Sequence, residues 1–139
     1  MIVDSSALIA LIHNEPQADD IFSMLIAASE VRMSAGSYLE TSIKLDRAGD
    51  AVISRRLDDV LREFGVAIEP FDHAQAVVAR RAYQDFGRGS GHPAKLNFGD
   101  TIAYALAAMR HDTLLYKGND FAHTDVQTAI RLLDDSAPD

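Results

Sequence analysis

The chain contains no cysteine, and its 139 residues hold no long apolar run. Without cysteine it can form neither a disulfide nor a thiolate metal site, and it has no cysteine nucleophile. No segment approaches the roughly 20 apolar residues that cross a bilayer, so we expect no interaction with a membrane. The first residues lack the basic and apolar regions of a secretory signal, and we therefore expect a cytoplasmic protein.

Several familiar motifs are absent as well. The sequence has no Gly-x-Ser-x-Gly elbow, no P-loop and no Gly-x-Gly-x-x-Gly. The histidines at positions 13, 73, 92, 111 and 123 share no spacing suited to a metal. There is also no internal repeat, linker or low-complexity tract. We therefore expect a single domain over residues 1–139, which is long enough to bury a full core.

Positive charge is scarce. Lysine and arginine total 13 against 21 aspartates and glutamates, which gives a net charge of −8. Such a charge argues against broad electrostatic attraction to nucleic acid. A local basic surface can still exist, and its candidates are Arg55, Arg56, Arg80, Arg81, Arg88 and Lys95. Residues 87–95 are rich in glycine and basic residues, which predicts an exposed loop.

Short apolar runs alternate with helical patterns along the chain, which is typical of βαβ units around a parallel sheet. Strands are predicted at residues 2–3, 31–34, 66–69 and 113–116, with a short fifth at 126–130. Helices are predicted at residues 7–12, 18–28, 37–49, 52–64, 73–86 and 98–110. We expect an α/β fold, a three-layer α/β/α sandwich with a central parallel sheet of four or five strands. Residues 134–139 are expected to fray.

Helix caps define several of these boundaries. Asp72 with Gln75 predicts a capped helix start, and Asn97 is predicted to cap the helix at 98–110. Ser37 and Glu40 have the spacing of a capping box, so a helix is expected to open there.

Four acids stand at the ends of predicted strands or the starts of predicted helices. Asp4 ends the first strand, and Asp120 follows the fourth. Glu40 and Asp100 each come three residues after a predicted cap. If the strands are parallel, all four carboxylates can gather at one edge of the sheet, where α/β proteins bind ligands. Clustered carboxylates repel one another unless a hard cation neutralises them, so the cluster implies Mg²⁺ or Mn²⁺.

Each acid also has a purely structural interpretation. Asp4 can cap the helix that follows it. Glu40 and Asp100 favour a helix N-terminus by their charge alone, although that role is compatible with metal binding. Asp120 lies in a turn, where acids need no function, and Asn119 could equally face the site.

Three other functions fit less well or stay open. A phosphotransferase of the haloacid-dehalogenase type expects a second Asp at position 6, which is Ser6 here. A phosphoacceptor receiver domain expects its Asp after a central strand and a later Lys, an order that this chain matches poorly. A binding module could use the acids only as caps. A saturable thermal response to Mg²⁺ would separate that module from a metal site.

Four segments together resemble one family. They are Met-Ile-Val-Asp-Ser-Ser-Ala at the start, Ser-x-x-Glu at 37–40, Asn-Phe-Gly-Asp-Thr-Ile-Ala-Tyr-Ala-Leu-Ala at 97–107, and Leu-Leu-Tyr-Lys-Gly-Asn-Asp-Phe at 114–121. In this order, and over nearly the whole chain, they resemble the PIN-domain ribonucleases, most of all the VapC toxins of bacterial type II toxin–antitoxin systems.

The resemblance implies a Mg²⁺-dependent endoribonuclease, in which Mn²⁺ can substitute. The family's first three acids match Asp4, Glu40 and Asp100. The fourth falls at Asn119 or Asp120, where many relatives have two adjacent acids. Asp4 and Asp100 would hold the metal most directly, while Glu40 and Asp120 would act through metal or water.

The resemblance also implies partners. These are an RNA substrate, a homodimer, and a VapB-type antitoxin that occupies the active site in a heterotetramer or a larger assembly. The loop at 88–95 could hold RNA phosphates or simply be solvated.

Overall fold

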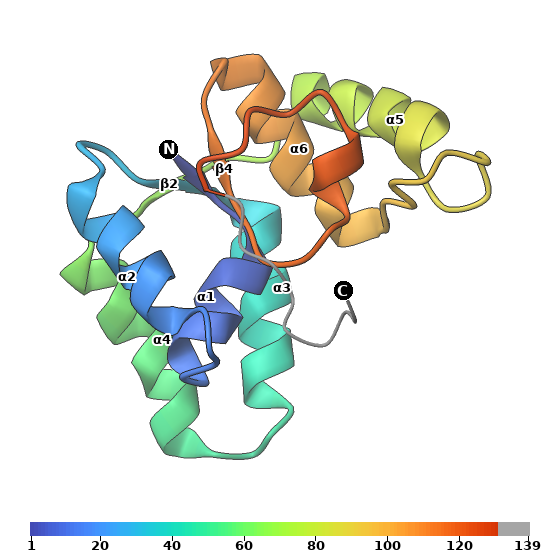
Figure 1. Cartoon of the computed structure of the whole chain (residues 1–139). Helices are drawn as coiled ribbons and strands as arrows, with labels where there is room; N and C mark the ends of the chain where they lie inside the picture. Colours follow the sequence, from blue (N-terminus) through green and yellow to red (C-terminus); the bar gives the residue numbers. More distant parts are fainter. Residues whose placement is uncertain (131–139) are drawn as a thin grey trace.

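The computed structural model describes residues 1–130, which form a four-stranded parallel sheet flanked by helices (Figure 1). The strands are β1 (Ile2–Val3), β2 (Arg32–Ser34), β3 (Ala67–Glu69) and β4 (Leu114–Leu115). Their order is β3-β2-β1-β4, and Ile2 pairs with Arg32 on one side and Leu114 on the other. Because β1 is an inner strand, the residue that follows it emerges in the middle of the carboxyl edge of the sheet.

Six α-helices and a short 3₁₀ turn surround the sheet in this part of the chain. They are α1 (Ser5–Ile12), α2 (Ala18–Ala27), α3 (Ala35–Asp46), α4 (Ala51–Glu63), α5 (His73–Phe86), α6 (Phe98–Arg110) and η1 (Phe121–His123). The predicted cap of α5 is confirmed, since Asp72 accepts a hydrogen bond from the Gln75 N–H at 2.9 Å. None of the helices within residues 1–130 has the length and apolar content of a membrane span.

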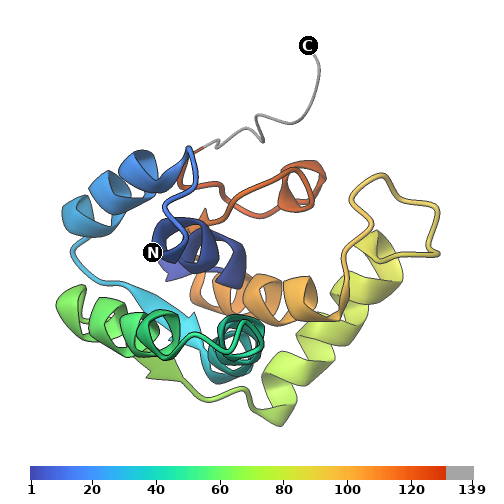
Figure 2. The same cartoon turned by 90° about the horizontal axis from the view of Figure 1, so that it is seen from below.

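Two hydrophobic cores lie on opposite faces of the sheet. Ile2 and Leu114 belong to the core under α5 and α6, whereas Val3 and Leu115 belong to the core under α1, α2 and α4. This alternation follows from the two-residue period of a strand. Figure 2 shows the two groups of helices on either side of the strands. The predicted three-layer α/β/α fold is therefore confirmed, with four strands in the sheet.

Helix α6 packs closely against the centre of the sheet because one of its faces consists of small and aliphatic residues. Ala103, Leu106 and Ala107 are all buried there. The small alanine side chains on this face let the helix axis approach β1. The first turn of α6 is thereby brought to the edge of the sheet at which β1 ends.

The predicted start of α3 is wrong. The helix begins at Ala35, and its cap is Ser34, whose hydroxyl accepts a hydrogen bond from the Gly36 N–H at 3.3 Å. Strand β2 runs directly into α3, so the cap falls on the last strand residue. Ser37 is consequently inside the helix, with its buried hydroxyl unpaired among the described residues. Gly49, with φ of +67°, lies in the turn beyond the helix end at Asp46.

The predicted fifth strand is also not formed. Residues 126–130 contribute one isolated parallel bridge, between Leu114 and Thr128. Two hydrogen bonds flank it, from Leu114 N to the Gln127 carbonyl at 2.7 Å and from Ala129 N to the Leu114 carbonyl at 3.0 Å. Strand β4 is only two residues long, so its outer edge offers little to pair with. The fraying expected at 134–139 lies outside the described residues.

Candidate active site at the carboxyl edge of the sheet

Asp4 lies at the centre of the site. It follows β1 directly, is only 3% exposed, and donates its N–H to the Leu115 carbonyl at 2.9 Å. Its carboxylate caps α1, with Oδ2 accepting hydrogen bonds from the Ser6 N–H at 3.0 Å and the Ser6 hydroxyl at 2.6 Å. Burial raises the pKa of Asp4, and the charge of Glu40 raises it further, while the hydrogen bonds from Ser6 partly offset both effects.

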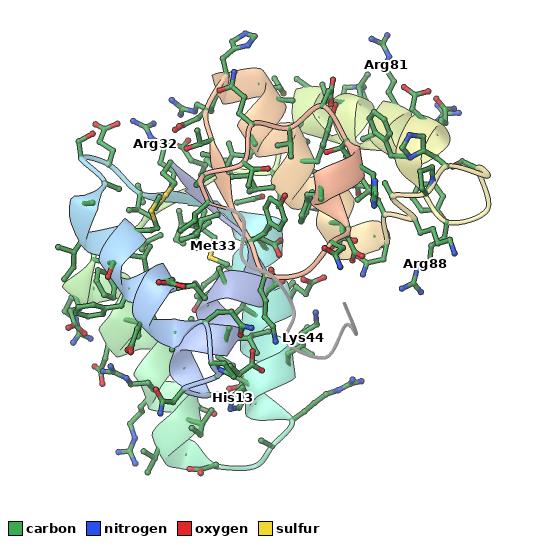
Figure 3. The ribbon with its side chains drawn as sticks, viewed as in Figure 1. His13, Arg32, Met33, Lys44, Arg81 and Arg88 are labelled. Atoms are coloured by element: carbon green, nitrogen blue, oxygen red, sulfur yellow. The ribbon has the colours of Figure 1, made fainter. Side chains whose placement is uncertain are left out.

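Glu40 reaches the site from the second turn of α3. Its Oε1 accepts a hydrogen bond from the Ser5 hydroxyl at 2.5 Å and pairs with Lys44 at 3.5 Å. Lys44 lies one turn further along the same helix (Figure 3). The Glu40 carboxylate rests directly against the backbone of α6 at Gly99, where any Cβ atom would overlap Oε2. Glycine at this position is therefore what lets α3 bring its carboxylate to the first turn of α6.

Asp100 is fixed by a capping box at the start of α6, in which Asn97 is the predicted cap. Its Oδ2 accepts a hydrogen bond from the Asn97 N–H at 2.9 Å, and Asn97 Oδ1 accepts one from the Asp100 N–H at 2.9 Å. These two bonds hold the carboxyl group in one rotamer at the helix N-terminus. The predicted helix, Phe98–Arg110, has these same bounds in the structure.

Asp100 interacts electrostatically with two other acids of the site. Burial raises its pKa to about 7, and the charges of Asp4 and Asp120 raise it as well. The interaction of the Asp120 side chain with that of Asp100 contributes to this rise in pKa. The Asn97 N–H opposes these effects by stabilising the ionised form. Glu40, Asp4, Asp100 and Asp120 thus form a continuous series of interacting carboxylates.

The turn after β4 supplies the fourth acid. Asp120 is exposed and stands just before η1, without capping it through its side chain. Within residues 1–130 the side chain of neighbouring Asn119 makes no hydrogen bond or ion pair. The turn is held to the site by its backbone, since the Lys117 N–H donates to the Ser6 hydroxyl at 3.0 Å. The Lys117 side chain forms an ion pair with Glu15 at 2.9 Å.

The donor set suits a hard divalent cation. All four groups are carboxylates, the ligand type that Mg²⁺ prefers. The pKa values of Asp4 and Asp100 are raised mainly by burial and in addition by the charges of neighbouring acids, and a bound cation would favour the ionised form of both groups. Among the residues described, no three His, Asp or Glu side chains lie close enough together to hold a metal ion by themselves. That openness is compatible with Mg²⁺, which usually keeps several waters and uses one or two carboxylates together with substrate phosphates.

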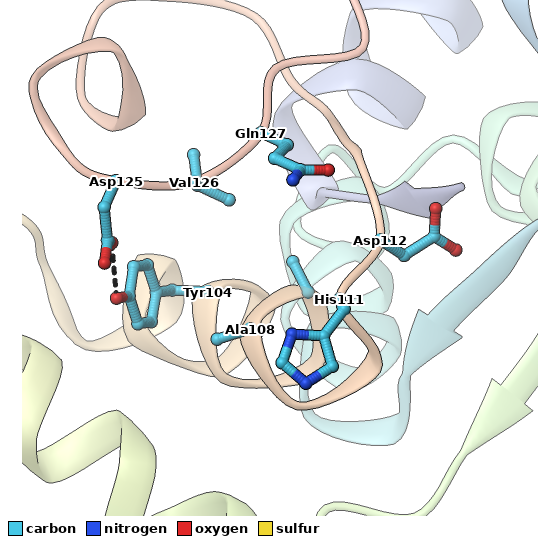
Figure 4. Close-up of a pocket in the computed structure, with 8 residues that line it drawn as sticks. Tyr104, Ala108, His111, Asp112, Asp125, Val126 and Gln127 are labelled. Carbon is cyan, nitrogen blue, oxygen red and sulfur yellow. Dashed lines mark hydrogen bonds between the residues drawn. The ribbon is translucent and has the colours of Figure 1, made fainter.

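A separate cavity of about 270 Å³ lies near the other end of α6 (Figure 4). Tyr104, His111 and Gln127 are among its lining residues, and the Tyr104 hydroxyl donates to Asp125 Oδ1 at 2.6 Å. Burial and the charge of Asp125 raise the pKa of Tyr104. None of the four site acids lines this cavity, so it is distinct from the carboxylate site.

Sequence reasoning overlooked two contributors to the site. The first is Gly99. The sequence did carry a signal for it, because glycine is a poor helix former and stands here in the first turn of a predicted helix. The second is the Lys117 N–H, for which the sequence carries no signal because backbone contacts depend on the fold. Ser5 and Ser6, which follow Asp4 directly, each donate a hydrogen bond to a carboxylate of the site.

Comparison with known proteins identifies the class. The family model described as "PIN domain" matches residues 1–127. Ribonuclease VapC28 of Mycobacterium tuberculosis is 54% identical over 130 residues, which cover 94% of this chain and 98% of the relative. The chain therefore belongs to the PIN-domain family and, within it, to the VapC ribonucleases. The predicted resemblance is confirmed.

Solved structures share the fold at low sequence identity. VapC20 of Mycobacterium tuberculosis, described as a sarcin–ricin loop cleaving toxin, has a TM-score of 0.73 at 16% identity, with 94% of this chain and 98% of that chain covered. A toxin–antitoxin complex from Klebsiella pneumoniae has a TM-score of 0.69 at 18% identity, with the same coverage of 94% and 98%.

The raised pKa of Asp100 predicts a pH-dependent stability in EDTA. Its folded value of about 7 exceeds the ordinary 3.8, so its contribution to stability is full below the ordinary value and is lost as pH rises to about 7. Asp100→Asn keeps an acceptor for the Asn97 N–H and carries no charge. We expect it to melt about 3 °C above the wild type at about pH 8, with a smaller gain at about pH 5.

Asp72→Asn is the matched control, because Asp72 also caps a helix but lies outside the carboxylate series. The measurement is the melting temperature of the wild type, Asp100→Asn and Asp72→Asn at both pH values. An Asp100→Asn variant that is no more stable than the wild type at either pH would contradict the raised pKa of Asp100.

Gly99→Ala should separate activity from stability. The new Cβ would displace the Glu40 carboxylate, while alanine gains about 1 kcal/mol of helix propensity. We expect a melting temperature within about 3 °C of the wild type and at least about a tenfold loss of ribonuclease activity. Gly36→Ala is the control, since its Cβ meets the apolar Ile102 Cγ2 at 2.9 Å. Full activity in Gly99→Ala would argue against a role for Glu40.

Proposed function

We propose that this protein is a divalent-metal-dependent endoribonuclease, the toxin of a type II toxin–antitoxin module, and that Asp4, Glu40, Asp100 and Asp120 form its catalytic site. Membership of the VapC ribonucleases supports the reaction class. The observation that carries the choice of residues is that the four acids influence one another: the charge of Glu40 acts on Asp4, and the charges of Asp4 and Asp120 act on Asp100. Carboxylates this close favour a cation between them.

In this proposal Asp4 and Asp100 hold Mg²⁺ most directly, and Mn²⁺ can take its place. When bound, the cation supplies Lewis-acid polarisation of the phosphate and lowers the pKa of an attacking water. Ser6 and Asn97 keep the two carboxylates oriented. Because the two carboxylates are already oriented, they need not rearrange during the reaction. The expected products carry a 3′-hydroxyl and a 5′-phosphate.

Glu40 and Asp120 flank this pair and act through metal or water. Glu40 is held by Ser5 and Lys44, so its carboxylate has a defined position from which to orient a water molecule. Asp120 is exposed, and its contact with Asp100 favours it over Asn119 as the fourth acid of the family pattern.

A binding module whose acids serve only as helix caps is the competing function. Asp4 and Asp100 do cap α1 and α6. Capping, however, requires no approach of one carboxylate to another. Asp50 and Asp72 cap α4 and α5 without joining the carboxylate series. The convergence of acids from separate elements therefore favours the nuclease.

We further propose an RNA substrate, a homodimer, and a VapB-type antitoxin as partners. The structural neighbour from Klebsiella pneumoniae is a toxin–antitoxin complex, and it shares this fold. An apolar surface beside the site supports a protein partner. Phe98, adjacent to Gly99, is 78% exposed and lines a cavity of about 480 Å³ together with Tyr83 and Ile102.

Asp4→Asn tests the function with two measurements. Asparagine preserves the cap of α1, so the protein should fold. We expect at least about a 100-fold loss of Mg²⁺-dependent RNA cleavage, and loss of the saturable thermal stabilisation by Mg²⁺. Asp50→Asn makes the same change at another helix cap and should alter neither measurement. Cleavage by Asp4→Asn at the wild-type rate would refute the proposal.

A further inference from the structure

A basic loop, defined here as residues 88–95, projects between α5 and α6 (Figure 1). Its neck is closed by the bridge between Gly87 and Leu96. The Arg88 N–H donates to the Leu96 carbonyl at 3.0 Å, and the Leu96 N–H donates to the Phe86 carbonyl at 2.9 Å. The two ends of the loop are thus tied together at the point where the chain enters α6.

The basic loop is held in shape by its own residues. The His92 ring packs edge-on against Phe86 with centroids 4.9 Å apart, and His92 Nδ1 accepts a hydrogen bond from the Ala94 N–H at 3.1 Å. Ala94 and Leu96 are buried, which anchors the returning strand of the loop. A loop fixed in this way loses little conformational entropy when it binds a ligand.

The surface that the basic loop presents suits an anion. A cavity of about 440 Å³ is lined by Arg88, Gly89, Gly91, His92, Pro93 and Lys95. Arg88 and Lys95 are exposed, and neither has an ion-pair partner within residues 1–130. Two cations that no acid neutralises in this region stand out in a chain whose net charge is −8.

The glycines of the basic loop add backbone donors to its cations. Gly89 and Gly91 have φ of +86° and +84°, with open space where a side chain would stand. Among the described residues neither glycine N–H has a hydrogen-bond acceptor. Backbone N–H groups without a covering side chain allow a phosphate oxygen to approach closely.

The position of the basic loop connects it to the carboxylate site. Lys95 precedes Asp100 by five residues, so their Cα atoms lie at most about 18 Å apart. A few nucleotides of one RNA strand can span that separation. Phosphates adjacent to the cleaved bond would meet strong repulsion from four acids unless cations nearby compensate for it.

We propose that the basic loop binds backbone phosphates of single-stranded RNA beside the bond that is cleaved. The inference rests on the proposed function, because it takes RNA as the substrate of the carboxylate site. The contacts are to phosphate, so they position the strand without selecting its sequence. An acidic protein segment is the competing ligand for the same charges, and the experiment below separates the two.

The first experiment measures cleavage kinetics of Arg88→Gln with Lys95→Gln. We expect about a tenfold rise in KM with kcat unchanged, because the substitutions remove attraction to RNA and leave the acids in place. The logarithmic dependence of kcat/KM on salt should become shallower by about 1.4, since each phosphate contact on a single strand contributes about 0.7. An unchanged KM and salt dependence would overturn the proposal.

Arg81→Gln and Arg88→Gln form the matched pair for single substitutions. Arg81 is also exposed and without an ion pair in the described part of the chain, but its side chain points away from the basic loop (Figure 3). We expect Arg88→Gln to raise KM by about threefold and Arg81→Gln to leave it unchanged. Equal effects of the two would mean that only net charge matters, which contradicts a specific site.

A second experiment measures binding without cleavage, so that it does not depend on catalysis. In the Asp4→Asn background, fluorescence anisotropy follows a labelled single-stranded RNA of mixed sequence. We expect the two loop substitutions to weaken binding about tenfold, and polyglutamate to compete poorly. RNA binding that is unaffected by the substitutions, or equal competition by polyglutamate, would overturn the loop proposal. Absence of Mg²⁺-dependent cleavage by the wild type would instead count against the proposed function.

Discussion

Repulsion among carboxylates at the carboxyl edge of the sheet is the constraint on which the site depends. Asp4 is buried at the end of the inner strand β1, and its charge reaches Asp100 on α6. A fold that served stability alone would separate these groups or pair them with cations. Here Lys44 pairs with Glu40, and within residues 1–130 the inner acids Asp4 and Asp100 have hydrogen bonds but no ion pair. The arrangement is compatible with the divalent cation that the proposed function requires.

Hydrogen bonds and close contacts with neighbouring residues hold those carboxylates in place. Ser6 fixes Asp4, and the Ser6 hydroxyl also accepts the Lys117 N–H, so one side chain joins the ends of β1 and β4. Asn97 fixes Asp100 through reciprocal bonds. Gly99 admits the Glu40 carboxylate to the first turn of α6. Each device depends on one residue type at one position, which connects the local sequence to the geometry of the site.

Features governed by local sequence could be predicted, and features governed by packing could not. The bounds of α6 followed from Asn97 and a small apolar face, both visible in the sequence. The start of α3 was misplaced because both Ser34 and Ser37 are residues that can cap a helix. Only the structure shows that β2 runs straight into the helix, which makes Ser34 the cap. The contact between Glu40 and Gly99 joins distant segments, and no local pattern reports it. The gathering of the acids was foreseen only through the assumption that the strands are parallel.

The central claim is that a divalent cation binds beside Asp100 and offsets the charges of the neighbouring acids, and the most direct measurement is the pKa of that carboxyl by NMR titration with and without Mg²⁺. Without a divalent cation, Asp100 should titrate near pH 7. With saturating Mg²⁺ the pKa should fall below about 5, because a nearby positive charge favours the ionised form. A pKa near 4 under both conditions would mean that the carboxylates neither repel one another nor share an ion.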